Sequence, residues 1–397
     1  MQNTDIIVSG GGIAGPALAH WLTRYGFRAT VVERAPAPRT GGQAVDLRGA
    51  GRTVVARMGL TDRLREVTLH QRGIAWVDAD GRVTARMPVE AFGGEGIVSA
   101  HEILRGDLAA VLAGAGPDVE HVHGDTITGL DEDADGVTVT FENAPPRRVG
   151  LVVGADGLHS AVRTLTFGDG GVRPLGLRTA WFTAPAAPDL DGWYLTHRAP
   201  GLVASLRPGR LPHESKAELS FRTASTDRRE PAEWVEEFAA RFAGVGWRAG
   251  WLVEAMRDAP DLAVDAVSQV HMPRWSRGRV VLLGDAGYCP TPLTGLGTSL
   301  ALVGAYVLAG ELAAAGGDHR VAFDRYERVL RPYVAQAQTL PPGGVGGYAP
   351  NSRLAIRAGA AALRAMTRRP VRPLLERQFA KADAIDLPDY TALAAAV

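Results

Sequence analysis

The sequence predicts an α/β protein. A Rossmann-like, dinucleotide-binding domain is interrupted by an inserted, mainly antiparallel β-sheet domain and is followed by a C-terminal helical segment. Three observations predict this architecture. The chain opens with a strand, a glycine-rich turn, a helix and a second strand, an order that implies a parallel sheet. Apolar strands return in the middle of the chain and late in it, as "GLVVGADG" and "GRVVLLGDA". Between these two strands lie three or four alternating, strand-like runs.

The bulk composition is that of an ordinary soluble globular protein, with 46% hydrophobic and 22% charged residues among 397. The 43 basic and 43 acidic residues balance, so nothing indicates a nucleic-acid partner. The single cysteine, Cys289, excludes an internal disulfide and a cysteine-based metal site, and the histidines show no metal-ligand spacing. The longest apolar run, "SLALVGAYVLAG", is about a dozen residues, too short for a bilayer. We expect a cytoplasmic protein without a metal or a membrane span, either a monomer or a weak dimer.

The first hundred residues predict the elements that open both domains. "TDIIVSG" is a short β-branched strand, "IAGPALAHWLTRYG" is a helix closed by Gly26, and "RATVVERA" is the second strand. "RGIAWVDADGRVTARMPV" alternates and turns at Asp80-Gly81, which predicts a hairpin. "HEILRGDLAAVLAG" is expected to be a helix throughout.

The middle of the chain predicts strands, and its last quarter predicts helices. Strands are expected at "DGVTVTFEN", "LRTAWFTA", "GWYLTHRA", "LVASLRP" and "AELSFRTA". A helix at "PAEWVEEFAARFAG" begins with proline in its first turn. The remainder from Thr298 on is mostly helical, broken by "LPPGGVGGYAP". The amphipathic helix in "PNSRLAIRAGAAALRAMTRR" is expected to cover a domain junction rather than a membrane surface.

These elements predict a discontinuous division of the chain. Residues 1–71, 99–171 and 273–345 form the dinucleotide-binding domain, residues 72–98 and 172–272 form the substrate-binding domain, and residues 346–397 form C-terminal helices that bridge the two.

The glycine run after the first strand is the strongest local motif. Gly10, Gly12 and Gly15 give G-x-G-x-x-G between a strand and a helix, the context that the dinucleotide fingerprint requires. The glycines permit a tight turn and let a pyrophosphate approach the helix N-terminus. Glu33 ends the second strand, where a carboxylate would accept from ribose hydroxyls, which favours FAD or NAD. Arg34 beside it leaves NADP open.

Two further motifs end apolar strands, Gly154-Ala155-Asp156-Gly157 and Gly284-Asp285-Ala286. Together with the glycine fingerprint, in this order and spacing, they resemble the triple signature of the para-hydroxybenzoate hydroxylase-like flavoprotein monooxygenases. The resemblance runs from Asp5 to Tyr333. Through "GGQAVDLRGAG" and "PLTGLGTS" it is nearest to the tetracycline-inactivating and aromatic polyketide hydroxylases of that family. It implies a glutathione-reductase-like fold for the nucleotide domain and FAD as its cofactor.

The same resemblance implies the residues that bind FAD. Glu33 would hold the adenosine ribose and Arg105 would reach the phosphate–ribityl region. Asp156 would serve both FAD and the nicotinamide cofactor, and Asp285 would bind the ribityl chain. The full expected set is Gly10, Gly12, Ile13, Ala14, Gly15, Glu33, Arg34, Gln43, Arg105, Ile127, Asp156, Asp285, Pro292, Gly295, Leu296, Gly297 and Thr298.

The segment after Asp285 is expected to pass beside the isoalloxazine ring. Pro290 and Pro292 break regular structure, and Gly295 and Gly297 let the backbone lie against a flat ring. A helix from about Thr298 would then point its positive end at the flavin, an effect of order 1 kcal/mol. No dedicated catalytic acid or base is visible in the sequence.

The implied activity is that of an FAD-dependent monooxygenase. NADPH or NADH would reduce the flavin, O2 would form a C4a-hydroperoxide, and an aromatic or polyketide-like small molecule would be hydroxylated. An FAD-dependent reductase or a halogenase of the same fold are the alternatives, together with a flavin-binding protein without turnover. By family resemblance, a halogenase needs a "WxWxIP" segment and a lysine early in the chain. This chain has no such segment, and its only lysines are Lys216 and Lys381. Oxygen-dependent NADPH consumption would distinguish the monooxygenase from the reductase and from the protein without turnover.

Aromatic residues and the lone cysteine leave two interpretations open. Tyr288 stands where the family often has histidine, and it either lines the flavin edge or packs with Cys289 in the core. The Thr298-Ser299 pair stands where the family often has asparagine. Packing within the inserted sheet is favoured over substrate stacking for Trp181, Phe182, Trp193 and Tyr194.

Overall fold

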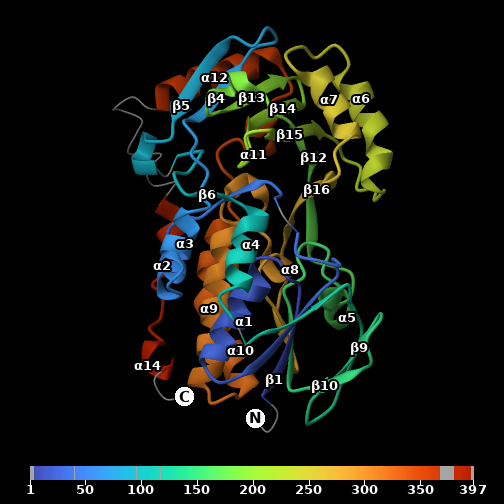
Figure 1. The fold of residues 1–397 in the computed structure, drawn as a ribbon, viewed down its shortest axis with the longest axis vertical. Helices are drawn as coiled ribbons and strands as arrows, with labels where there is room; N and C mark the ends of the chain where they lie inside the picture. The colour runs from blue at the N-terminus through green and yellow to red at the C-terminus, as the bar shows by residue number, and fades with distance from the viewer. Residues whose placement is uncertain (1–3, 40, 95, 117, 367–379, 395–397) are drawn as a thin grey trace.

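A six-stranded sheet forms the lower half of the computed structural model, which describes residues 4–39, 41–94, 96–116, 118–366 and 380–394 (Figure 1). Its strands pair in parallel, except at one edge, where β17 (Ser276–Arg277) is antiparallel to β18 (Val280–Leu282). Ile6, Ile7 and Val8 are buried, as expected for a strand that is covered on both faces. The strand order is β17 (Ser276–Arg277), β18 (Val280–Leu282), β11 (Leu151–Gly154), β1 (Asp5–Ser9), β2 (Arg28–Glu33) and β7 (Glu120–His123).

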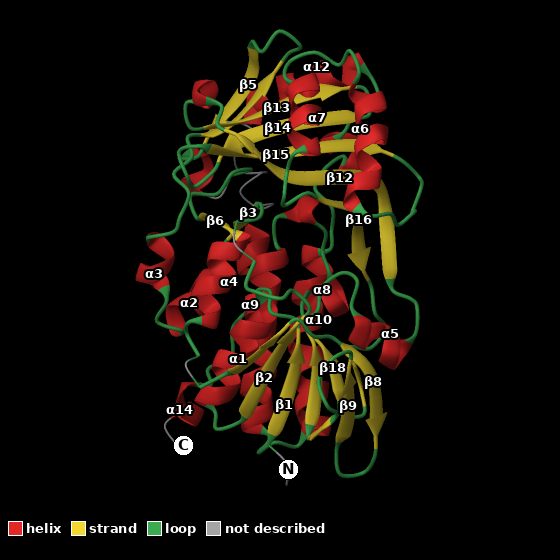
Figure 2. Cartoon of the chain, turned by 45° about the vertical axis from the view of Figure 1, so that its right-hand side comes forward, coloured by secondary structure: helices red, strands yellow, loops and turns green. Residues whose placement is uncertain are grey.

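Helices cover one side of this sheet and a small sheet covers the other (Figures 1 and 2). On the helical side lie α1 (Ala14–Arg24), α4 (Arg105–Ala113), α9 (Gly297–Ala314) and α10 (His319–Ala337). On the other side lie α5 (Ala161–Phe167) and the antiparallel strands β8 (Ile127–Glu132), β9 (Val137–Phe141) and β10 (Arg147–Val149). Their apolar side chains form one core with the parallel sheet.

Helix α9 is the centre of this core. It is long and apolar enough to cross a membrane by length and composition, yet 83% of its 18 residues are buried inside the protein. It packs against α1, α10 and α2 (Ala50–Arg57). The apolar run expected from the sequence ends before Glu311, whereas the helix continues to Ala314. The buried Glu311 carboxylate accepts a hydrogen bond of 2.6 Å from the Tyr390 hydroxyl, which satisfies this charged side chain inside the core.

A seven-stranded sheet forms the upper half (Figure 2). It is antiparallel except where β13 pairs in parallel with β4, so it is mainly antiparallel as predicted. Every strand lies within the two predicted substrate segments. The order is β16 (Ala263–Val270), β12 (Val172–Pro185), β15 (Glu214–Arg222), β14 (Leu202–Pro208), β13 (Trp193–Ala199), β4 (Gly73–Val77) and β5 (Val83–Pro88).

The two faces of the upper sheet have different neighbours. Phe182, Leu219 and Phe221 point to the outer face, where α6 (Val235–Phe242) and α7 (Ala249–Arg257) complete an apolar core. The inner face is met by α11 (Gly344–Tyr348) and by α12 (Arg353–Met366), which packs on β5 and β13. We call these the outer face and the inner face below.

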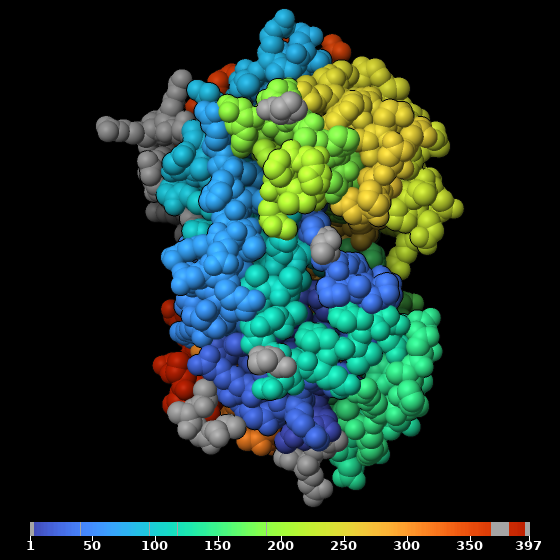
Figure 3. Space-filling view, in the orientation of Figure 1, coloured from blue at the N-terminus to red at the C-terminus, as the bar shows by residue number. Residues whose placement is uncertain are grey.

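Short elements join the two halves. Strands β3 (Ala44–Asp46) and β6 (Glu102–Leu104) pair between them, and α3 (Thr61–Arg65) follows α2. In the space-filling view, N-terminal segments in blue and cyan run up the left side across both halves (Figure 3). The remaining short helices are η1 (Ala91–Gly94), η2 (Pro188–Leu190), η3 (Pro231–Trp234), α8 (Asp285–Tyr288), η4 (Pro292–Thr294), η5 (Ala380–Asp383) and α14 (Thr391–Ala394).

Two predicted helices begin later than the sequence suggests. The helix expected over 101–114 starts as strand β6, because Glu102–Leu104 pairs with Ala44–Asp46, and helix α4 begins only at Arg105. The helix expected from Pro231 starts with one 3₁₀ turn, closed by a capping box between Glu230 and Glu233, before α6 begins. The part of the predicted amphipathic helix that falls on residues 367–370 lies outside the described residues.

Candidate active site

The glycine loop lies between β1 and α1, at the carboxyl end of the parallel sheet. Gly10 has a φ of +109°, and a Cβ there would lie 2.4 Å from the Ala155 carbonyl oxygen, so only glycine fits. A Cβ on Gly15 would lie 1.9 Å from the Gly10 carbonyl oxygen, which brings α1 close to the strand. The loop geometry therefore needs glycine at these two fingerprint positions.

The space in front of this loop is open. A Cβ on Gly12 would meet only Arg105 Nη2, at 3.7 Å, among the described atoms. Helix α1 begins at Ala14 without a side-chain cap on Ile13, so its first N–H groups have no side-chain partner there. An uncapped helix N-terminus that faces an arginine across a gap is a suitable cradle for a pyrophosphate.

Glu33 closes one end of the cradle. Its Oε2 accepts from the Gly11 N–H at 2.7 Å, and its Oε1 accepts from the Ala35 N–H at 2.9 Å. Desolvation opposes ionisation, but these two hydrogen bonds and Arg39 outweigh it and hold the pKa of Glu33 below its usual value. The carboxylate is thus ionised at neutral pH and able to accept from sugar hydroxyls.

Asp285 lies at the other end of the cradle. It follows β18 as the first residue of α8, and a Cβ on Gly297 would lie 3.9 Å from its Oδ1, so the carboxylate stands beside the N-terminus of α9. Burial raises the pKa of Asp285, and the positive charge of Arg105 opposes this rise. Arg105 therefore links the glycine loop electrostatically to Asp285.

The turn between Asp285 and α9 presents backbone to the same region. Gly295 has a φ of +65°, and a Cβ there would lie 2.9 Å from Asp46 Oδ2. Helix α9 begins at Gly297 with no side-chain cap on Leu296. Pro292 is exposed at the start of η4, whereas Leu296 and Thr298 are buried behind the turn.

The other expected cofactor residues take different positions. Arg34 is exposed, and Ala14 is buried under the loop. The Gln43 carbonyl accepts from the Arg105 N–H at 3.0 Å, and its amide donates to the Ala217 carbonyl of the upper sheet at 3.2 Å. Ile127 is buried in β8, two residues after Asp125, whose N–H donates to the Glu33 carbonyl oxygen at 3.2 Å.

Asp156 meets the glycine loop with its backbone and not with its carboxylate. A Cβ on Gly10 would lie 2.8 Å from the Asp156 Cα. The carboxylate turns away, accepting from the Ser160 hydroxyl and from the Val162 N–H at 3.2 Å. Desolvation raises the pKa of Asp156 against these hydrogen bonds. This acid organises the start of α5 in the described structure.

Taken together, these residues fit FAD. A glycine cradle with an arginine suits the pyrophosphate, Glu33 suits the adenosine ribose, and Asp285 suits the ribityl hydroxyls. The exposed backbone of the Gly295 turn and the uncapped end of α9 suit the flavin ring. The fold and this site define an FAD-binding flavoprotein.

Comparisons with known proteins agree with this class. The family described as FAD binding domain matches residues 3–339, and the chain belongs to it. An uncharacterized protein of Mycobacterium tuberculosis, Rv1260, is 43% identical over 87% of this chain and 94% of its own length. Flavin-dependent monooxygenases from an unknown prokaryotic organism and from Legionella longbeachae are 39% and 37% identical, each over 84% of this chain and over 87% and 86% of their own lengths.

Solved structures place the chain in the same group. The crystal structure of the tetracycline destructase Tet(55) matches with a TM-score of 0.83 and 34% identity, covering 98% of this chain and 99% of the other. HpxO of Klebsiella pneumoniae, solved with FAD and uric acid, is 22% identical with a TM-score of 0.75 over 95% and 97% of the two chains, and shows the shared fold. The protein is an FAD-dependent monooxygenase of this family.

A buried cluster of charges, which the sequence did not reveal, joins the turn to the upper sheet. Asp46 and Glu102 stand directly opposite each other on β3 and β6. Arg48 Nη2 lies 3.2 Å from Asp46, and Arg207 Nη1 donates to Glu102 at 2.8 Å. Burial raises the pKa of Glu102 to about 7, against the opposing charge of Arg207 and with the added effect of Asp46. The pairing of β3 with β6 was the missing signal, since residues 101–114 were expected to be helical.

Hydroxyl groups gather around a second acid on the inner face. Glu218 accepts from the hydroxyls of Tyr348 and of Ser220, the latter at 3.1 Å, and from Tyr194 at 3.4 Å. Tyr348 comes from α11, which also contacts η4 beside the expected flavin position. The segment "LPPGGVGGYAP", expected only to break a helix, thus delivers a polar side chain to the site.

Tyr288 and Cys289 pack in the core. The Tyr288 hydroxyl lies 2.8 Å from that of Tyr326, and its ring packs against Trp275 with centroids 4.6 Å apart. Both residues are buried, and desolvation raises the pKa of the Cys289 thiol well above its usual value. The core interpretation of Tyr288 holds, and the interpretation that Tyr288 lines the flavin edge does not.

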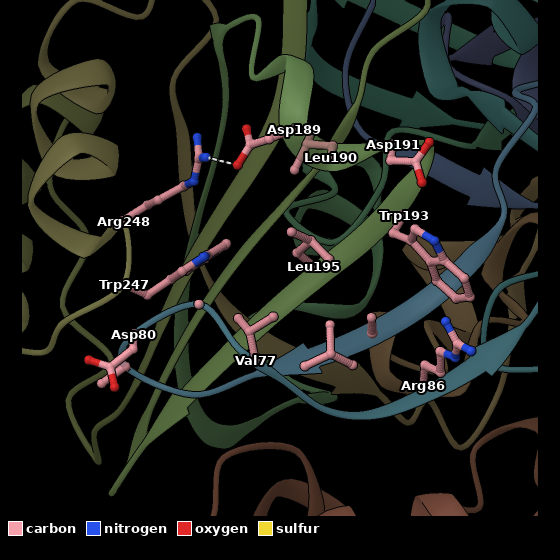
Figure 4. A pocket seen from close by; sticks show the side chains of 14 residues that line it. Val77, Asp80, Arg86, Asp189, Leu190, Asp191, Trp193, Leu195, Trp247 and Arg248 are labelled. Carbon is pink, nitrogen blue, oxygen red and sulfur yellow. Dashed lines mark hydrogen bonds and ion pairs between the residues drawn. The ribbon is translucent and has the colours of Figure 1, made fainter.

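The aromatic residues of the upper sheet divide between its faces. Phe182 is fully buried in the outer core, and Trp181 packs on the inner side with Leu293 and Tyr348. Trp193 lines an outer cleft of about 570 Å³, opposite Trp247 (Figure 4). Within the described residues, no group of three or more His, Cys, Asp or Glu side chains could hold a metal ion.

Proposed function

We propose that NADPH or NADH reduces the bound FAD and that the enzyme then uses O2 to hydroxylate an aromatic or polyketide-like small molecule. The observation that carries this proposal is the convergence of the Gly295 turn, Asp46 and the Tyr348–Glu218 cluster at the junction of the two halves. A substrate held there would lie between the flavin edge and the inner face of the upper sheet.

The chain's own residues have three tasks in this scheme. Arg105, Glu33 and Asp285 bind and orient the cofactor, whose reduced ring supplies the oxygen chemistry when bound. Leu293, Val345 and Trp181 form an apolar cluster with Tyr348 that keeps water from the turn. The hydroxyls around Glu218 offer donors and acceptors that orient a phenolic or carbonyl oxygen of the substrate.

Support for the substrate class comes from relatives. The solved relatives Tet(51) and Tet(55) are named tetracycline destructases, at 30% and 34% identity. A polycyclic, oxygen-rich substrate would suit an inner face that carries both aromatic rings and hydroxyls. For this chain we propose an aromatic or polyketide-like substrate.

The test measures reduction of the flavin first and transfer of an oxygen atom to the substrate second. Anaerobic NADPH or NADH should bleach the flavin absorbance, slowly alone and faster with a true substrate from a panel of polycyclic phenols. Admission of air should then give a product heavier by one oxygen atom. A product formed without O2 would indicate a reductase, and hydrogen peroxide alone with every compound would indicate an oxidase. Halide incorporation would indicate a halogenase.

A further inference from the structure

Two nitrogen donors lie buried side by side near the inner face with no hydrogen-bond acceptor. They are Arg198 Nε, on β13, and Trp76 Nε1, on the neighbouring strand β4. The guanidinium carbon of Arg198 lies 3.5 Å from the centroid of the Trp76 ring. Because burying a donor without an acceptor destabilises the folded protein, such a pair needs an explanation.

Arg198 differs from the buried arginines of the chain. Arg48, Arg163, Arg178 and Arg207 each donate to a carbonyl or carboxylate oxygen of the protein. Within the described part of the chain, no carboxylate pairs with Arg198, which has Trp76, Tyr194 and Tyr348 as neighbours. Burial lowers the pKa of Arg198 to about 10, so the side chain is still a cation at neutral pH. A positive charge is therefore held there without a balancing negative one.

The strand alternation places this cation on the side of the active site. Residues Trp193, Leu195 and His197 point to the outer face, so Tyr194 and Arg198 point to the inner face. Tyr348, a neighbour of Arg198, lies on α11 beside η4. Arg198 as a whole residue is half-buried, and its Nε is buried.

We propose that Arg198 and Trp76 form an anion-binding subsite that receives the carboxylate or phenolate of an aromatic substrate. This rests on the proposed function and specifies its substrate class as acidic aromatic molecules. A carboxylate oxygen would accept from Arg198 and Trp76 and satisfy both buried donors, and charge-assisted hydrogen bonds of this kind are the strong ones. Arg198 is then a specificity residue that binds the substrate away from the reacting carbon.

Binding to the FAD-loaded enzyme without any nicotinamide tests the subsite. The probes are 2-naphthoate and its neutral isostere 2-naphthamide, each titrated against the change in flavin absorbance. We expect wild type to bind the acid about tenfold or more tightly than the amide. Arg198→Gln should remove this preference by weakening the acid alone, and Arg198→Lys should retain part of it. Trp76→Phe should weaken the acid by a smaller factor.

Arg86→Gln is the matched control. Arg86 also stacks on a tryptophan, Trp193, but it lines the cleft on the outer face of the same sheet (Figure 4). Its substitution should leave the preference for the acid unchanged. Absence of binding or of acid preference in wild type overturns the subsite, and so does an unchanged preference in a folded, FAD-loaded Arg198→Gln. This binding assay needs no turnover, so its result does not depend on whether the proposed hydroxylation takes place.

Discussion

Asp285 tests the cofactor site at the scale of a single residue. Its carboxylate stands beside the uncapped start of α9. Asp285→Ala should weaken FAD binding by about 1–3 kcal/mol, because a charged acceptor for the ribityl hydroxyls is lost. The measurement is a titration of the FAD-free protein followed by flavin fluorescence. An FAD affinity in Asp285→Ala equal to that of wild type would refute the role.

Glu102 gives a prediction about pH. Its pKa is raised from 4.5 to about 7 in the folded state, so the folded protein binds this proton more tightly than the unfolded chain. The stability that the protonated group contributes is present below pH 4.5 and is lost as the pH rises toward 7. Glu102→Gln cannot lose a proton. Its free energy of unfolding should therefore rise relative to wild type between these pH values, as measured by urea denaturation at each pH. A constant difference would contradict the shift.

Substituting one glycine in α9 and one in α7 tests how tightly each helix is packed. A Cβ on Gly304, within α9, would lie 2.2 Å from the Tyr288 hydroxyl, which is held by Tyr326. A Cβ on Gly250, in α7, would meet nothing within 4 Å. Gly304→Ala should destabilise the protein by about 1–3 kcal/mol through overpacking, whereas Gly250→Ala should stabilise it by up to about 1 kcal/mol. Thermal unfolding distinguishes the two, and equal effects would show that α9 can shift.

Sequence reasoning recovered the elements whose patterns are local. The first strand and helix, the hairpin at Asp80-Gly81 and the strands of the upper sheet other than β16 follow from alternation and turn residues. Strand β6 was missed because only its pairing with β3, more than fifty residues earlier, makes it a strand. The same holds for side chains. The fingerprint spacing indicated Glu33 and the resemblance indicated Asp285. The contacts of Arg207 with Glu102 and of Tyr348 with Glu218 form only between segments that are distant in the sequence.

At the scale of the whole molecule, the two halves are joined by buried polar contacts. Arg207 of the upper sheet binds Glu102 below it, and the Gln43 amide donates to the Ala217 carbonyl. FAD held in the lower half should therefore protect both halves together. At an FAD concentration about 100 times Kd, the free energy of unfolding should rise by about 2.7 kcal/mol.

Tryptophan fluorescence and far-UV circular dichroism should record this stabilisation as one transition. Trp181 and Trp234 report on the upper sheet, while the dichroism is dominated by the whole chain's helices and strands. An upper sheet that melts at an unchanged temperature while the flavin signal shifts would show that the halves unfold independently.

The order of strands in the lower sheet also determines when these strands can pair during synthesis of the chain. Strand β1 pairs with β11, and β11 pairs with β18, so the strands of these two central pairs are separated by well over a hundred residues of chain. The first strand leaves the ribosome long before its central partners exist, and the buried α9 follows later still. The nascent N-terminal half must therefore wait with Ile6, Ile7 and Val8 uncovered. Cofactor capture is consequently a late event, possible only after about three quarters of the 397 residues have been made.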